Sequence, residues 1–363
     1  MKFDLFQICE NPTGEASSDL GEVLDQIVLA EDLGFGSVWI AEHHGSRYGS
    51  VPNPAVLGAA IASRTSRIGI GAGVSVLPFH HPIRVAEDYA LLDVISNGRL
   101  KFGCGRGYQP KEFAAFGVEL TNSRDIFQES LDIIRGLWEN ETFSYRGKFY
   151  AFDDFALNPR PVQESVPIWM VASSTDSYPL AAANRVQILT QASVRQTVEE
   201  LRENVATARA AYADLGFAPE DVDIVMNIPV HLEETTERAE AVARDRLAWQ
   251  FQQMRALSPG ADGSPIPKGY ESYKKYGPVD TSPVEGGGNS AWSFSALNES
   301  KVVLVGTPDE AKSHLEVLKN DIGIDHVMCC MRFGGMDHEA VLRSLQLWSD
   351  EVMPAFADAS VSA

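Results

Sequence analysis

Cysteine is scarce in this chain of 363 residues, and cationic side chains are outnumbered by anionic ones. The four cysteines form no C-x-x-C pair, and the composition does not fit a disulfide scaffold. Thirty lysines and arginines stand against fifty aspartates and glutamates, which gives a formal net charge of −20. A field of that sign repels phosphate backbones, so we expect no nucleic-acid partner. An anionic small ligand would need a cation placed beside it.

Long apolar runs are missing as well. No stretch approaches the roughly 20 apolar residues of a membrane span, so we expect no membrane association. The first residues place Asp4 and Glu10 around a short apolar run, where a secretory signal needs a basic lead and a longer apolar core. The sequence therefore predicts a cytoplasmic enzyme with reduced thiols.

Short apolar runs alternate with amphipathic, helix-period segments along nearly the whole chain. Strands that recur between helical patterns of about 10–15 residues indicate βαβ units and a parallel sheet. The predicted strands are 3–8, 38–41, 68–76, 100–104, 166–171, 186–189, 224–230 and 324–329. Eight such units are the count of a (β/α)8 barrel, or TIM barrel. A doubly wound open sheet is the alternative architecture.

The chain exceeds a typical barrel by about 100 residues, and two segments can hold the excess. Residues 139–165 are rich in aromatic side chains and predict a small β insertion between the fourth and fifth units. Residues 257–290 contain seven glycines and five prolines without an apolar period. A compact domain seldom keeps so long a structureless loop unless it is a lid or disordered, so we expect a mobile lid. Residues 1–363 would then form one domain.

Polar residues that directly follow a predicted strand are the candidates for chemistry, because barrel active sites lie at the carboxyl ends of the strands. Glu42, His43 and His44 follow the second strand. They offer a carboxylate and two imidazoles, which serve as acid–base groups or as metal ligands. Histidines exposed at the start of a loop are the plainer alternative.

Glycines alternate along the third strand, at Gly69, Gly71 and Gly73. Such glycines weaken a strand and are usually kept where a ligand or another backbone comes very close. Val74 stands where a dinucleotide-binding G-x-G-x-x-G pattern needs its third glycine. The pattern favours a flat ligand against bare backbone over a pyrophosphate loop, with tight packing in a narrow barrel as the alternative.

An arginine flanked by two glycines, Arg106, ends the fourth strand. Its planar, always-charged fork suits bidentate binding of phosphate or carboxylate, and a structural ion pair with Glu42 or Asp88 is the alternative. The fifth strand ends in the hydroxyl-rich segment 172–177, a composition that binds anions but also caps helices. The two strands are neighbours in a barrel, so one phosphate could contact both segments.

Metal catalysis is the main rival class. Glu42, His43, His44, His80 and His81 follow adjacent strands, but the H-x-H that barrel hydrolases carry after their first strand is absent. No G-x-S-x-G elbow occurs either, which argues against nucleophilic hydrolysis. We therefore assign no metal.

Short motifs along almost the whole chain resemble one family, the bacterial luciferase-like, flavin-dependent monooxygenases. The matching stretches are 34–39 leading into Glu42-His43-His44, Asn53-Pro54, Val76-Leu77-Pro78, 81–84, 86–88, 91–93, 96–99, Phe102-Gly103, Arg106-Gly107, Phe116-Gly117, 122–124, Gly306-Thr307-Pro308 and Val352-Met353-Pro354. They are specific together and not singly. The resemblance implies a single (β/α)8 domain that takes reduced FMN from a separate flavin reductase and adds O2 at flavin C4a. The expected substrate is an apolar carbonyl compound or natural product, and the expected assembly is a homodimer.

The resemblance also implies roles for individual residues. By matching position Arg106 would bind the FMN phosphate, and three serines would complete that site. These are Ser173, Ser174 and Ser177. A non-proline cis peptide that supports the isoalloxazine ring would fall on Gly73–Val74.

His43 matches the histidine that acts as base or hydrogen-bond partner to the C4a-peroxyflavin, and Glu42 and His44 join it as catalytic candidates. Residues 257–290 match the mobile lid that shields this intermediate from water.

Two departures from the family pattern concern substrate and light emission. Gly105 stands where the luciferase catalytic subunit has a cysteine, with Cys104 one residue earlier, and Ser173 replaces an acidic residue. They argue against light emission and against specificity for long-chain aldehydes. The alternatives that stay open are an F420-dependent hydride-transfer enzyme on the same fold and a noncatalytic flavin-binding partner subunit.

Overall fold

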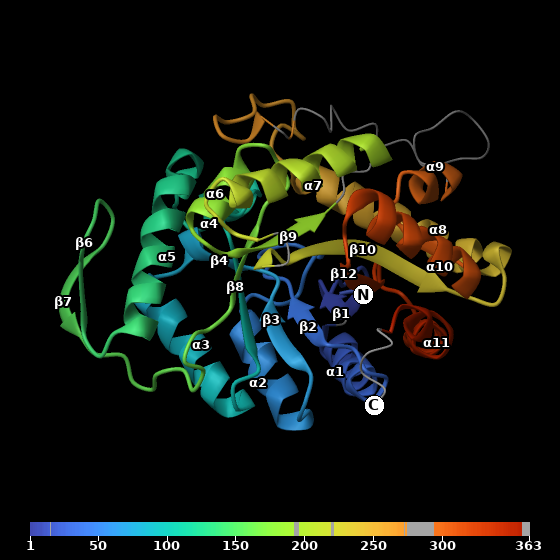
Figure 1. Ribbon diagram of the computed structural model, residues 1–363, viewed down its shortest axis with the longest axis horizontal. Coiled ribbons are helices and arrows are strands. Elements are labelled where there is room, and N and C mark those ends of the chain that lie inside the picture. The colour runs from blue at the N-terminus through green and yellow to red at the C-terminus, as the bar shows by residue number, and fades with distance from the viewer. Residues whose placement is uncertain (15, 192–195, 219–220, 272, 274–293, 358–363) are drawn as a thin grey trace.

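The computed structural model describes residues 1–14, 16–191, 196–218, 221–271, 273 and 294–357 (Figure 1). Eight parallel strand positions close into a barrel, because β9 pairs with β10 and β12 pairs with β1. The barrel strands are β1 (Lys2–Gln7), β2 (Ser37–Ile40), β3 (Gly69–Ala72) with β4 (Ser75–Val76), β5 (Leu100–Gly105), β8 (Ile168–Val171), β9 (Gln187–Gln191), β10 (Ile224–Leu232) and β12 (His326–Arg332). The predicted (β/α)8 barrel is confirmed, and the open-sheet alternative is wrong.

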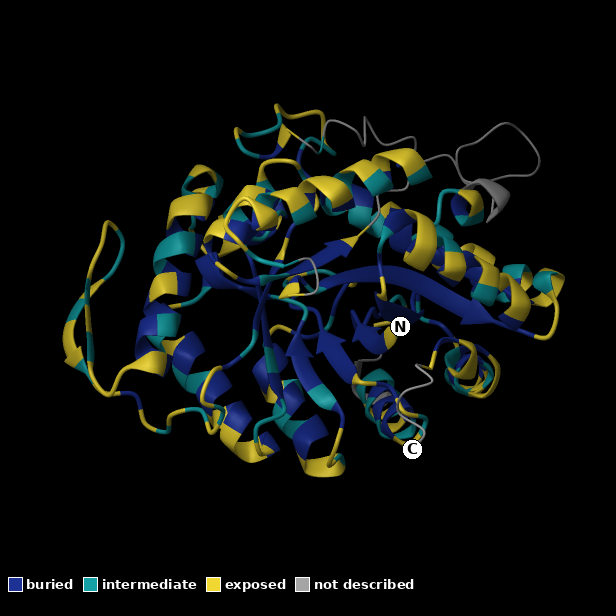
Figure 2. Ribbon diagram, in the orientation of Figure 1, coloured by how far each residue is buried: buried dark blue, intermediate teal, exposed yellow. Residues whose placement is uncertain are grey.

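Helices surround the barrel, so that the strands are buried and the helices are exposed on their outer faces (Figure 2). They are α1 (Ala16–Asp32), α2 (Pro54–Arg64), α3 (Pro82–Ser96), α4 (Pro110–Ala115), α5 (Ser123–Glu139), α6 (Ser177–Ala183), α7 (Val198–Ala213), α8 (Thr236–Leu257), α9 (Phe294–Glu299), α10 (Pro308–Glu316) and α11 (His338–Leu347). None of the helices in the described part of the chain has the length and apolar character that a bilayer crossing requires.

The third predicted strand, residues 68–76, is two strands in the structure. β3 pairs with the start of β5, and the chain leaves the ladder at Gly73 and Val74, whose peptide bond is cis. It rejoins β5 at Ser75, opposite Cys104. The cis bond lies at the position that the family resemblance implies.

Two segments lie outside the regular barrel. Residues 139–165 contain an antiparallel pair, β6 (Phe143–Arg146) and β7 (Ala151–Phe155), which projects beside α5 (Figure 1). β11 (Leu304–Gly306) extends the sheet at the far end of β10. Of the expected lid, residues 272 and 274–290 lie outside the described residues.

The amino-terminal end of the barrel is filled by a buried ion network. Asp4 accepts hydrogen bonds from Trp39 Nε1 at 2.7 Å and from His326 Nε2 at 3.0 Å, and Asp223 faces His326 Nδ1 at 2.9 Å. Burial alone would lower the pKa of His326, but hydrogen bonds to Asp223 and Asp4 outweigh it and raise this pKa to about 9. His326 is therefore charged at neutral pH, and the network closes this end of the barrel.

All four cysteines are buried, two of them on β12 and one each near β1 and on β5. Cys104 donates a hydrogen bond to Trp169 O at 3.3 Å. Burial raises the pKa of Cys104 to about 12, so its thiol stays protonated at neutral pH. It is a small core residue and not a nucleophile.

Candidate functional site

A cavity of about 270 Å³ lies at the carboxyl ends of the strands. This is the end at which (β/α)8 enzymes carry their active sites. The predicted site residues that line the cavity are Glu42, His43, Gly73, Val74, Arg106, Ser173, Ser174 and Ser177. His44 is the predicted site residue that lies behind this lining.

The structure shows why glycine occurs at three positions of the third predicted strand, and the explanation differs among them. A Cβ on Gly69 would come within 2.5 Å of Ser37 Oγ, and one on Gly71 within 2.4 Å of the Trp39 ring. Tight packing therefore explains these two, and the close-ligand interpretation is wrong for them. Gly73 does line the cavity, at the cis bond to Val74, although a Cβ there would also come within 3.1 Å of the Phe6 and Trp39 side chains. This peptide gives the cavity one wall of nearly bare backbone.

Arg106 lines the cavity and is held by the segment that follows α8. Its guanidinium stacks on the Tyr270 ring, 4.8 Å from the centroid, and donates from Nη2 to Gly269 O at 3.1 Å. Within the described residues Arg106 forms no ion pair, because Asp88 pairs with Arg84 and Glu42 with histidines. The structural ion-pair alternative is therefore wrong, and most of the fork is left for a ligand.

The three serines line the same cavity as Arg106. Ser177 Oγ accepts hydrogen bonds from the backbone N–H groups of Ser173 at 3.2 Å and Ser174 at 3.0 Å, and donates to Ser174 O at 2.8 Å. These two amides are thus already paired. An anion here would be bound by the guanidinium and by serine hydroxyls.

His43 lies in the cavity wall, and its contacts include two buried residues of the segment after β5. Gln109 Nε2 lies 3.0 Å from His43 Nδ1, and Glu112 Oε1 lies 3.5 Å from the same nitrogen. Glu112 Oε1 also accepts the backbone N–H of His44 at 2.8 Å. Sequence reasoning missed Gln109 and Glu112, because they follow Arg106 by three and six residues and belong to a helix start rather than to a strand end.

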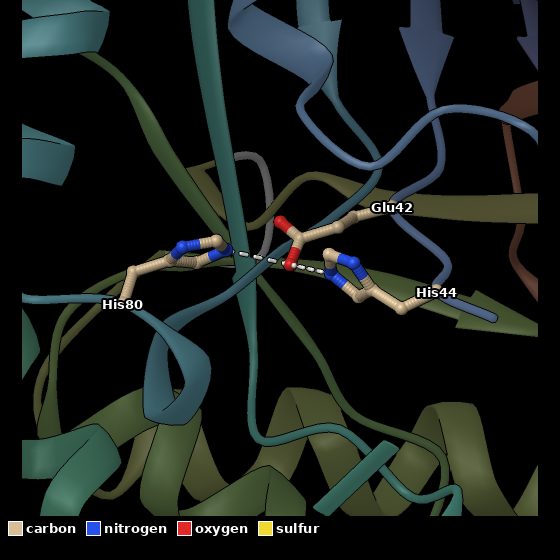
Figure 3. A group of neighbouring side chains, drawn as sticks. All are labelled: Glu42, His44 and His80. Carbon is tan, nitrogen blue, oxygen red and sulfur yellow. Dashed lines mark hydrogen bonds and ion pairs between the residues drawn. The ribbon is translucent and has the colours of Figure 1, made fainter. Parts of the chain in front are cut away.

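Glu42, His44 and His80 form a second group (Figure 3). Both imidazoles point at one carboxylate oxygen of Glu42, with His80 Nε2 at 2.7 Å and His44 Nε2 at 3.0 Å from Oε1. The other oxygen accepts the backbone N–H of Val76 at 3.1 Å. Glu42 therefore ties the exit of β2 to β4, directly after the cis peptide.

Electrostatics favour the charged forms of Glu42 and His80. Burial would raise the pKa of Glu42, but hydrogen bonds from His44 and His80 outweigh it and lower this pKa. Burial would likewise lower the pKa of His80, but the hydrogen bond to Glu42 and its charge raise it. An ionised carboxylate with a readily protonated imidazole needs no further partner.

The metal alternative can be tested against this geometry. Glu42, His44 and His80 bring one ligand atom each to within 4.8 Å of one another, which a divalent cation could bridge. His43 contacts Gln109 instead, and His81 Nδ1 accepts the N–H of Ile83 at the start of α3. Hydrogen bonds to Glu42 account for the arrangement without a cation.

Three tyrosines form a further part of the cavity wall. The rings of Tyr108 and Tyr273 stack at 5.7 Å between centroids, and Tyr270 lies beside Tyr273. Tyr270 Oη donates to Gly107 O at 3.0 Å. The described part of the segment 257–290 thus supplies cavity wall, and sequence reasoning did not foresee which of its residues do so.

Comparison with known proteins identifies the class. The model of the luciferase-like monooxygenase family matches residues 1–326, and the chain belongs to that family. It is 27% identical to the alkanal monooxygenase alpha chain of the Kryptophanaron alfredi symbiont over 99% of each chain. It is 25% identical to the oxygenase component of the flavin-dependent trigonelline monooxygenase of Acinetobacter baylyi, over 99% of this chain and 97% of that protein.

Solved structures show the same architecture. Monooxygenase RslO1 from Streptomyces bottropensis has a TM-score of 0.83 at 26% identity, covering 98% of this chain and all of that one. The oxygenating constituent of 3,6-diketocamphane monooxygenase from Pseudomonas putida, in complex with FMN, has a TM-score of 0.77 at 22% identity, covering 98% of each chain. An F420-dependent secondary alcohol dehydrogenase has a TM-score of 0.74 at 18% identity, covering 98% and 99%. The last two likenesses show the fold alone, and related structures thus contain either FMN or F420.

Proposed function

We propose that the protein is a two-component monooxygenase that uses reduced FMN and O2 to oxygenate an apolar carbonyl compound or natural product. One observation carries this proposal. One cavity is lined by the guanidinium of Arg106, by serine hydroxyls, by the cis peptide Gly73–Val74 and by the imidazole of His43. A phosphorylated, flat cofactor with a reacting centre beside an acid–base group matches this lining.

The residues at the phosphate end fit FMN. Arg106 keeps most of its donors for a ligand in a chain of net charge −20, where an unpaired cation in a cavity is informative. Its fork would take two phosphate oxygens, and the hydroxyls of Ser173 and Ser174 would donate to the others. Ser177, whose proton goes to Ser174 O, would hold this serine loop in place. Gly73 and Val74 would support the ring. The bound, reduced flavin supplies the electrons with which O2 is activated.

His43 is the acid–base group of this proposal, because it lines the cavity and its Nδ1 is held by Gln109. Glu42 and His44 are positioning residues that fix the strand next to the cis peptide. Glu42 holds Val76 and hence the wall on which the flavin rests, and His44 anchors Glu42. The segment 257–290 serves as the lid that keeps water from the reacting atoms, with Tyr270 as its contact to the phosphate end.

The proposed partners are a separate flavin reductase and a second copy of this chain. The likeness to an oxygenase component supports the reductase. The outer faces of α2 and α3, which pack together, expose apolar side chains: Val56 is 69% exposed, Leu91 47% and Ile95 48%. An exposed apolar patch on neighbouring helices suits a homodimer. We propose that the assembly acts in the cytoplasm.

The test first compares the affinities for two reduced cofactors and then measures the incorporation of oxygen from O2 into a product. Purified protein is titrated with reduced FMN and with reduced F420 under anaerobic conditions, and the preferred complex is mixed with O2 and a panel of apolar ketones and aldehydes. We expect tighter binding of reduced FMN and one oxygen atom from labelled O2 in a product. Preference for F420 with hydride transfer and no oxygen incorporation would establish the alternative enzyme. Binding of FMN with no turnover of any kind would indicate a noncatalytic subunit.

A further inference from the structure

His43 is held on three sides of its ring. Nδ1 faces Gln109 and Glu112, the Tyr48 ring packs at 4.8 Å between centroids, and a Cβ on Gly49 would come within 2.9 Å of His43 Cδ2. The ring edge left for the cavity carries Nε2, which has no hydrogen-bond partner among the described residues. A ligand in the cavity therefore exchanges protons with His43 through Nε2. Whether Nε2 of the neutral ring accepts or donates depends on whether Nδ1 carries the proton.

The hydrogen bond between the Gln109 amide and His43 Nδ1 depends on whether Nδ1 is protonated. Gln109 is only 1% exposed, and its Oε1 has no donor in the described part of the chain. An amide nitrogen donates to Nδ1 only when Nδ1 carries a lone pair, which belongs to the tautomer with the proton on Nε2. Half a turn of the amide exchanges its two ends. Gln109 Oε1 then accepts a hydrogen bond from the protonated Nδ1 of His43, and His43 Nε2 carries the lone pair.

Neither orientation of this amide satisfies both of its ends. When the amide nitrogen faces His43, Gln109 Oε1 is buried without a donor. When the amide oxygen faces His43, the amide nitrogen is buried without an acceptor. Tyr108 Oη, 3.4 Å from Gln109 Nε2, accepts from the nitrogen in the first orientation and can donate to the oxygen in the second. Both orientations thus keep a bond to His43 and one to Tyr108, and each leaves one atom of the amide unpaired. A carboxylate at this position would only accept, and would hold the proton on Nδ1.

We propose that Gln109 is a positioning residue that supports both neutral tautomers of His43 by turning its amide. The inference rests on the proposed function, which makes His43 the acid–base group. As a base, Nε2 takes a proton from the reacting group while the proton on Nδ1 is held by Gln109 Oε1 and faces the Glu112 carboxylate. His43 Nε2 later returns that proton, and the neutral ring is restored. With the amide turned, the other tautomer carries its proton on His43 Nε2 and donates a hydrogen bond to the ligand. One histidine thus serves as base and as acid without leaving its place.

The test measures the tautomer directly by nitrogen NMR of protein with labelled histidine, in which His43→Ala identifies the His43 signals. In the wild type we expect both ring nitrogens to resonate between the protonated and unprotonated positions, because the two tautomers exchange. Gln109→Glu should hold the proton on Nδ1 and leave Nε2 unprotonated. Gln109→Leu should give a tautomer ratio different from both. Gln346→Leu, on the exposed side of α11, is the matched control and keeps the wild-type signals.

An assay of coupled oxygenation is the second measurement. Gln109→Leu should lower coupled oxygenation about 10- to 100-fold, the loss typical of removing the outer partner of a functional histidine, while FMN affinity is unchanged. A single tautomer in the wild type, or His43 signals that are the same in both Gln109 variants, would overturn the proposal. Absence of oxygenation in the wild type would instead refute the proposed function and leave the tautomer measurement valid.

Discussion

The guanidinium of Arg106 rests on the ring of Tyr270, 4.8 Å from its centroid, although the two residues come from opposite halves of the chain. The Tyr270 hydroxyl donates to Gly107 O and accepts from Ser123, both at 3.0 Å. Burial raises the pKa of Tyr270, so this hydroxyl keeps its proton. These two hydrogen bonds fix the ring on which the guanidinium rests in the cavity lining.

Replacing Arg106 with alanine should weaken binding of reduced FMN by about 2–3 kcal/mol, because a charge-assisted, bidentate contact to the phosphate is lost. Riboflavin lacks the phosphate and should bind both proteins alike. Anaerobic fluorescence titration with the two flavins measures the difference. Arg84→Ala, which removes an exposed arginine of α3, is the control. Equal loss for both flavins would show that Arg106 is structural.

His43→Ala should leave the affinity for reduced FMN unchanged and lower substrate oxygenation by about 10²-fold or more, as expected when a positioned acid–base group is removed. Oxygen should still be consumed, and H2O2 should replace the oxygenated product. Measuring product and peroxide against the O2 consumed gives the coupling. His338→Ala, at the start of α11, should couple like the wild type. Unchanged coupling in His43→Ala would show that His43 has no catalytic role and is only a histidine at the start of a loop.

Glu42→Gln should destabilise the fold by about 1–3 kcal/mol, because hydrogen bonds to a buried carboxylate are lost and an amide nitrogen would face a donor. It should also weaken FMN binding, since Val76, which Glu42 holds, follows the peptide proposed to support the flavin. Urea unfolding and flavin titration measure the two effects. Glu87→Gln, whose carboxylate pairs with exposed Arg84, should change stability by less than about 0.5 kcal/mol. A Glu42→Gln protein as stable as this control would refute the anchoring role.

The buried network at His326 should make stability depend on pH in the alkaline range. The pKa of His326 is about 9 in the folded protein and close to 6.5 when unfolded, so its contribution is complete below pH 6.5. It is lost as pH rises through 9, and the loss is on the order of 3 kcal/mol at 1.36 kcal/mol per pKa unit. Urea unfolding between pH 6.5 and 10 measures it.

The matched variant is His326→Gln, whose stability should change less over this range because no charge is lost, and His338→Gln should keep the wild-type dependence. A wild-type unfolding free energy that is constant across the range would contradict the charged state assigned to His326.

The barrel and the strand-end residues were predictable because both follow from local patterns. Apolar periods of two and of 3.6 define the units, and in a barrel every strand ends at the same face, so the sequence alone makes Glu42, His43 and Arg106 candidates. The break between β3 and β4 was not predictable from these periods, since the apolar run 68–76 is continuous in sequence.

Residues whose role depends on long-range packing were missed. Tyr270 reaches Arg106 from a segment without any period, and Gln109 and Glu112 face His43 from the first turn of α4. The pairing of Glu42 with His80 joins residues 38 positions apart. Only the folded chain shows that these side chains meet, because neither spacing nor composition encodes which loops touch.

The burial of all four cysteines makes the protein suited to site-specific labelling. Thiolates react and thiols do not, and burial raises the pKa of each of these side chains far above neutral pH. A cysteine introduced on the surface would therefore be the single reactive thiol of the folded protein, with none of the native cysteines replaced. A fluorophore attached at Tyr273→Cys, beside the stacked Tyr108, would report on this wall of the cavity while ligands bind.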